Sequence, residues 1–175
     1  YVWSVPRSLR RQREVCIRSR CRSKGTLSGF TPDQGQYMVD HWMGEKDWIN
    51  EEVVRVPMIV VDPRAQADVT RGTVSNQLVE AIDLVPTFVE ALGGENDTRT
   101  QWLEGESLVP LLHGGHGTER DFVVCEADWG VLGMSHYVGD LNEPRKRRVK
   151  MLRNDRYKYV LSEIGPNLLY DLEDD

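Results

Sequence analysis

The residues of this chain that are best suited to chemistry lie in the segment 31–48, TPDQGQYMVDHWMGEKDW. Asp33 and Gln34 follow a short apolar run and a turn-forming proline, so their side-chain oxygens lie where a strand is expected to end. Carboxylate and amide oxygens are ligands that hard divalent cations prefer, and the ammonium group of Lys46 suits an anion held by such a cation. These residues predict one side of a metal site that binds an oxyanion.

Two strands are expected to position this segment. Residues 25–30 predict a short strand that leads directly into the loop containing Asp33. Residues 55–61, RVPMIVV, form a nearly continuous apolar run. Such a run is typical of a strand that is buried on both faces in a parallel sheet.

A helix is expected next, over residues 75–92, because apolar side chains recur there at three- and four-residue steps. Ser75 is its predicted N-cap, Pro86 should kink it, and a pair of glycines should end it. Residues 104–112, EGESLVPLL, predict a loop followed by a short helical turn.

The last part of the chain predicts strands over residues 121–126, 149–153 and 157–161, and the turn residues Asn154 and Asp155 join the last two as a hairpin. A strand-and-helix part followed by strands alone predicts an α/β fold with a smaller antiparallel subdomain. The sequence is therefore divided into a basic segment 1–24 of unclear origin, a core part 25–112 and a C-terminal subdomain 113–175.

The composition excludes several classes of protein. The 175 residues suffice for one domain or for a piece of a larger one. With 39% hydrophobic and 29% charged residues, the chain is typical of a globular protein, and no apolar run approaches the roughly 20 residues of a membrane helix. Three cysteines without metal-ligand spacing indicate neither a disulfide framework nor a zinc site, which favours a reducing compartment and a cytoplasmic location.

Two basic clusters stand apart from the net charge of −6. Residues 1–24 carry eight Lys or Arg side chains and a single acid, and residues 144–150 have the sequence PRKRRVK. An organelle leader is one hypothesis for the first cluster, and nucleic-acid binding is a rival hypothesis for both. Neither an amphipathic period nor a recognition helix accompanies them, so nucleic acid is the less favoured partner.

Seven blocks of this sequence, in order, resemble a known family: FTPDQG, DHWMGEKDW, EEVVRVPMIVVDP, AIDLVPTFVEALGG, LEGESLVPLLHG, MLRNDRYKYV and NLLYDLEDD. They resemble the C-terminal half of sulfatases in the alkaline phosphatase superfamily, most of all the branch that includes phosphonate monoester hydrolases. The resemblance covers about residues 26–175. It implies a metal-dependent hydrolase of sulfate, phosphate or phosphonate esters, with a large α/β sandwich and a small antiparallel sheet at the C-terminal end.

The resemblance also implies roles for four residues. Asp33 and Gln34 match two metal ligands of the family, which would hold Ca²⁺, Mg²⁺ or Mn²⁺, although a proline precedes Asp33 where the family usually has serine. Lys46 matches a lysine that contacts the anionic group of the substrate. His41 matches the histidine of a G-[DE]-H block, as a second substrate-binding residue, and Val39 stands where that block usually has glycine.

The family nucleophile is expected outside these 175 residues. It is a formylglycine made from the cysteine of Cys-x-Pro-x-Arg, and this sequence contains no such motif. Ca²⁺ needs about six to eight oxygen ligands, whereas Asp33 and Gln34 supply two or three. We therefore expect a fragment of a longer enzyme, inactive alone, whose segment 1–24 is a product of out-of-frame translation. A non-catalytic remnant is the alternative, and a homo-oligomer of the intact enzyme is left open.

Other ionisable residues are assigned to supporting roles. Asp40, Glu51 and Glu52 are predicted to be surface or supporting acids rather than catalytic carboxylates. His113 and His116 lie among glycines, which predicts a loop rather than a metal site.

Overall fold

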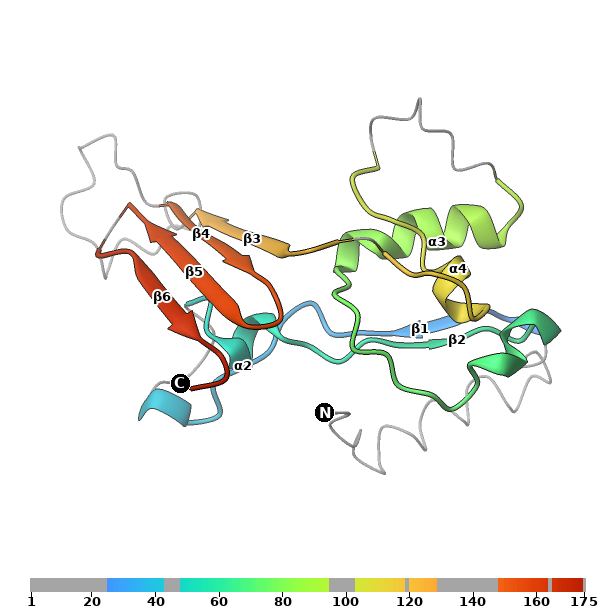
Figure 1. The fold of residues 1–175 in the computed structure, drawn as a ribbon, viewed down its shortest axis with the longest axis horizontal. Coiled ribbons are helices and arrows are strands. Elements are labelled where there is room, and N and C mark those ends of the chain that lie inside the picture. Colours follow the sequence, from blue (N-terminus) through green and yellow to red (C-terminus); the bar gives the residue numbers. More distant parts are fainter. Residues whose placement is uncertain are drawn as a thin grey trace. The chain divides into compact units, whose positions relative to one another are not determined.

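The computed structural model describes residues 25–42, 48–94, 103–118, 120–128, 148–163 and 165–174, which form two compact units (Figure 1). The first unit holds the described residues of 1–35 and 55–119, and the second holds those of 36–54 and 120–175. The basic segment 1–24 lies outside the described residues, so its assignment stays a prediction. In the part of the chain that the structure describes, no helix is both long and apolar enough to cross a bilayer.

The first unit contains a short two-stranded sheet. β1 (Ser28–Phe30) pairs antiparallel with β2 (Ile59–Val61), with Gly29 opposite Val60. β2 is shorter than the strand predicted over residues 55–61, because Pro57 has no backbone N–H to donate to a neighbouring strand. The expectation of a parallel strand buried on both faces was wrong for the described residues, since β2 runs antiparallel to β1 and Val61 is 42% exposed. An apolar run does not specify the direction of its partner strand.

The predicted helix begins later than expected. Its helical part consists of η4 (Ala81–Asp83) and α3 (Leu84–Ala91). The Ser75 hydroxyl instead accepts a hydrogen bond from the Gln77 amide in a local turn, at 3.2 Å. Pro86 lies in the first turn of α3, where the backbone N–H groups have no intrahelical partner, so no kink is needed. The predicted glycine stop is confirmed, because Gly93 has a φ of 81° and bonds back to the last turn.

Two polar side chains are buried where η4 meets α3. The side chains of Asp83 and Thr87 are fully buried, and each takes part in two hydrogen bonds. Asp83 accepts from the amides of Glu80 (2.7 Å) and Glu106 (2.9 Å), while Thr87 donates to the Asp83 carbonyl (2.6 Å) and accepts from the Leu108 amide (2.8 Å). Four apolar residues of this region are exposed, namely Ile82, Val85, Phe88 and Leu92, whereas Pro86 is buried.

Two short helices complete the first unit. η3 (Ala65–Val69) follows β2, and α4 (Val109–Leu112) packs beside α3. α4 agrees with the helical turn predicted within residues 104–112, and Gly114, with a φ of 79°, follows its end. Gly105 approaches the backbone of η4 so closely that an added Cβ would lie 2.2 Å from the Ile82 carbonyl oxygen.

The second unit is built on a four-stranded antiparallel sheet in the order β3-β4-β5-β6. Its strands are β3 (Val123–Asp128), β4 (Arg148–Arg153), β5 (Tyr157–Ser162) and β6 (Leu168–Asp171). The predicted antiparallel strands and the β4-β5 hairpin are confirmed, whereas β6 was not predicted. Residues 36–54 also belong to this unit, through η2 (Asp40–Trp42) and α2 (Glu51–Val54). Its core consists of Ile49, Val149, Met151 and Val160.

Candidate functional site

Asp33 and Gln34 lie where the sequence predicted, in the loop that leaves β1. Asp33 is exposed at a bend and Gln34 is half-buried. Both carry oxygen donors of the kind that hard cations prefer. Among the described residues, no group of three or more His, Cys, Asp or Glu side chains could hold a metal ion. The pair fits a divalent cation in the chemistry of its donors, but it would supply only part of the ligands that such a cation needs.

His41 lies in the second unit, on η2, and contacts an acid from α2. Its Nε2 atom is 3.3 Å from Oε1 of Glu52. The ring of Tyr37, which is fully buried, meets the imidazole edge to face, with ring centroids 6.1 Å apart and an angle of 85° between the ring planes. One nitrogen of His41 is thus held by Glu52, while half of the side chain is exposed. Lys46, the other predicted substrate contact, lies outside the described residues.

The backbone around His41 is strained. Met38, Val39, His41 and Trp42 all have positive φ values, between 52° and 82°. The largest value belongs to Val39, a β-branched residue for which the left-handed region is a genuine outlier. Glycine would adopt this conformation at little cost, and glycine is the residue that the resemblance noted in the sequence leads one to expect here.

The two adjacent acids of α2 have different partners. Glu51 accepts hydrogen bonds from Arg153 (3.3 Å) and from Lys158 (3.2 Å), whose side chain is only 5% exposed. Glu51 thereby connects α2 to β4 and β5, in agreement with its predicted supporting role. Glu52 contacts His41, which sequence reasoning missed because eleven residues separate the two and no periodicity connects them.

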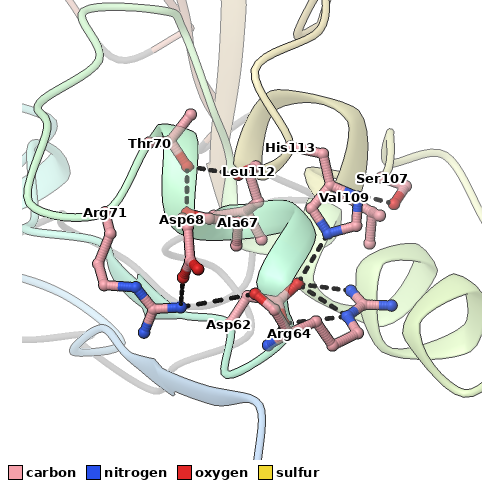
Figure 2. A network of polar contacts seen from close by, with 10 residues as sticks. All are labelled: Asp62, Arg64, Ala67, Asp68, Thr70, Arg71, Ser107, Val109, Leu112 and His113. Atoms are coloured by element: carbon pink, nitrogen blue, oxygen red, sulfur yellow. Dashed lines mark hydrogen bonds and ion pairs between the residues drawn. The ribbon is translucent and has the colours of Figure 1, made fainter.

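The first unit contains a buried polar cluster that was not predicted (Figure 2). Asp62, whose side chain has no exposed area, accepts hydrogen bonds from Arg64 through Nε (2.9 and 3.0 Å), Nη2 (2.6 Å) and the backbone amide (2.9 Å). It also contacts Nε2 of His113, at the end of α4, at 3.0 Å. The bonds from the Arg64 side chain hold the pKa of Asp62 well below its usual range, although burial acts to raise it.

This cluster ties the end of β2 to the end of α4. Thr70, just after η3, adds a hydrogen bond from its hydroxyl to the Leu112 carbonyl, as Figure 2 shows. Both carboxylate oxygens of Asp62 accept hydrogen bonds from residues of its own unit. The arrangement is therefore typical of a structural clamp rather than of a metal site. His113 was predicted to lie in a loop, and it lies in the turn that follows α4.

The described part of the second basic cluster is paired with acids of the neighbouring strand. Lys150 contacts Glu126 at 2.7 Å, and Arg148 contacts Asp128 at 3.4 Å. These pairs link β4 to β3 on one face of the sheet. Nucleic-acid binding by this cluster stays the less favoured hypothesis.

Comparison with known proteins relates this chain to sulfate and phosphonate ester hydrolases. The family model described as N-sulphoglucosamine sulphohydrolase, C-terminal, matches residues 40–175. The chain is 29% identical over 152 residues to the multifunctional alkaline phosphatase superfamily protein PehA of Trinickia caryophylli, covering 86% of this chain and 29% of that protein. It is 28% identical to an N-acetylglucosamine-6-O-sulfatase of Bacteroides thetaiotaomicron, covering 86% and 25%.

A solved structure supports the same relationship. The phosphonate monoester hydrolase of Agrobacterium radiobacter matches with a TM-score of 0.76 and 29% identity, over 94% of this chain and 32% of that one. The expected fold class, the C-terminal portion of an α/β sandwich with a small antiparallel sheet, is thereby confirmed. The chain spans 25% to 32% of the length of these three proteins.

Proposed function

The chain belongs to the sulfatase family of the alkaline phosphatase superfamily, and from this membership we propose that it serves the metal-dependent hydrolysis of sulfate, phosphate or phosphonate esters. The observation that carries the proposal is the oxygen pair Asp33 and Gln34 directly after β1, in a chain whose residues 40–175 match the family. The substrate is an anionic ester. A cytoplasmic location and a homo-oligomeric assembly stay predictions.

Each of the four residues has a proposed task. Asp33 and Gln34 provide oxygen ligands for Ca²⁺, Mg²⁺ or Mn²⁺, together with ligands that the described residues do not supply. A cation held there would supply Lewis-acid polarisation of the ester. Lys46 and His41 contact the anionic group and offset the charge that develops on it during attack. The nucleophile of the proposed reaction is a formylglycine, and no Cys-x-Pro-x-Arg motif occurs within these 175 residues.

The metal role of Asp33 can be tested on the full chain with Mn²⁺, whose paramagnetism broadens the NMR signals of nearby amides. We expect broadening around residues 33 and 34 in the wild-type chain and its loss in Asp33→Ala. Asp121→Ala removes another exposed carboxylate and serves as the matched control, in which the broadening should persist. Equal broadening in wild type and Asp33→Ala would contradict the assignment of this ligand.

Activity is tested with an aryl sulfate, an aryl phosphate and an aryl phosphonate ester. We expect the 175-residue chain to give no turnover above the uncatalysed rate, with or without divalent cations. Its sequence contains no Cys-x-Pro-x-Arg motif, and the described residues supply only part of a ligand set. Metal-stimulated turnover that is lost in Asp33→Ala would refute the proposed inactivity of the chain while supporting the role of Asp33.

A further inference from the structure

The contact between His41 and Glu52 assigns the proton of one ring nitrogen. An ionised carboxylate has only acceptor atoms, so the Nε2 atom that lies 3.3 Å from Glu52 must be the donor of this hydrogen bond. The second ring nitrogen, Nδ1, is then the one left for a further partner. A carboxylate that fixes one nitrogen of a histidine in this way sets both its tautomer and its ring orientation.

Burial of one carboxylate oxygen of Glu52 is energetically unfavourable. Its other carboxylate oxygen, Oε2, is buried and has no hydrogen-bond partner among the described residues. An unsatisfied buried polar atom is unfavourable, and in a native protein it needs an explanation. Structural anchoring of α2 does not require Glu52, because the adjacent Glu51 already bonds to Arg153 and Lys158.

Two further observations indicate that the orientation of the His41 imidazole is restricted. The ring of Tyr37, with no exposed area, contacts His41 edge to face and limits how the imidazole can turn. His41 itself has a φ of 55°, a left-handed conformation that is costly for a residue other than glycine. Such strain is retained mainly where the surrounding structure requires one orientation of a side chain.

We propose that Glu52 is a positioning residue: it accepts the Nε2 proton of His41, so that Nδ1 of the doubly protonated ring is left to donate a hydrogen bond to an oxygen of the anionic ester. This inference rests on the proposed role of His41 as a contact for the substrate anion. It goes beyond that role by naming the acid that orients the histidine and the ring nitrogen that faces the substrate.

NMR of the ¹⁵N-labelled full chain tests the proposal without requiring activity. Loss of signals in His41→Ala assigns the His41 ring nitrogens. We expect Nε2 of the wild-type chain to carry a proton that exchanges slowly with water, because Glu52 accepts it. Glu52→Gln should keep this proton, since its amide oxygen can accept the same bond, whereas Glu52→Ala should lose it. Glu126→Ala removes an exposed acid of the same unit and should leave the His41 signals unchanged.

The outcomes separate the two proposals. A wild-type His41 protonated on Nδ1 and not on Nε2, or a slowly exchanging proton that persists in Glu52→Ala, would overturn the positioning role. Titration with inorganic sulfate then probes the anion contact, and we expect the Nδ1 signal to shift in the wild-type chain and at least tenfold more weakly in Glu52→Ala. The predicted Nε2 proton without any sulfate response would support the positioning by Glu52 and refute the substrate contact of His41.

Discussion

Replacing Asp62 by Asn should strongly destabilise the first unit. The substitution keeps the size of the side chain but removes its charge and turns one acceptor atom into a donor that faces the donors of Arg64. Asp62 has no exposed side-chain area, so the lost bonds cannot be replaced by water around it. Removing one partner of a buried ion pair costs about 3–5 kcal/mol. We expect about 3 kcal/mol, because the side chains of Arg64 and His113 are 35% and 24% exposed and can be partly rehydrated.

Asp68→Asn is the matched control for this prediction. Asp68 also pairs with an arginine, Arg71, at 2.5 Å, but the two side chains are 64% and 51% exposed. Exposed ion pairs contribute at most about 1 kcal/mol, so this variant should be nearly as stable as the wild type. The free energy of unfolding is measured by urea denaturation followed by far-UV circular dichroism. Amide hydrogen exchange of α4 reports on the end of the clamp formed by His113.

The dependence on pH provides a second measurement. The pKa of Asp62 is lower in the folded chain than its ordinary value of 3.8, so the stabilisation is fully present above that value and is lost as the pH falls below it. The difference in unfolding free energy between wild type and Asp62→Asn should be constant from about pH 7 to 5 and should shrink below about pH 4. A loss no larger than that of Asp68→Asn, or a difference unchanged at pH 3, would refute the assignment of Asp62 as a buried ionised clamp.

The remaining predictions concern the backbone. Val39→Gly should stabilise the second unit by about 1 kcal/mol in urea denaturation, because relief of the left-handed strain at φ 82° outweighs the added chain entropy; a destabilised variant would contradict this account. Gly105→Ala should destabilise the first unit by about 1–3 kcal/mol, because its Cβ would lie 2.2 Å from the Ile82 carbonyl oxygen. Gly25→Ala is its control, since an added Cβ there meets nothing within 4 Å, and equal effects of the two alanines would refute the steric argument.

Features with local causes could be predicted from the sequence. The β4-β5 hairpin forms because the Asn154 side chain accepts hydrogen bonds from the amides of Arg156 (2.9 Å) and Tyr157 (2.6 Å), all within one turn. The glycine stop after α3 is equally local. The start of the helix was mispredicted because apolar periodicity continues through residues 75–80, whereas Glu80 and Asp83 supply the capping box.

The candidate site could be predicted only in part. Asp33, Gln34 and His41 could be proposed as site residues because they lie within one continuous segment that resembles a family motif, and their roles stay predictions. The pairing of Glu52 with His41 and of Asp62 with His113 depends on how separate segments meet, and no sequence spacing encodes it. The antiparallel direction of β2 likewise depends on which strand lies beside it in the fold. The apolar run of β2 does not specify this strand.

The buried hydrogen bonds of Asp83 and Thr87 have a consequence for the rotational setting of α3. Hydrogen bonds made by Asp83 and Thr87 are directional, so a rotation of α3 by one residue would break them together, whereas an apolar contact tolerates small displacements. The angular setting of α3 against α4 is therefore determined within the first unit alone. The exposed apolar residues Ile82, Val85 and Leu92 therefore contribute little to this setting, which depends on two buried polar side chains.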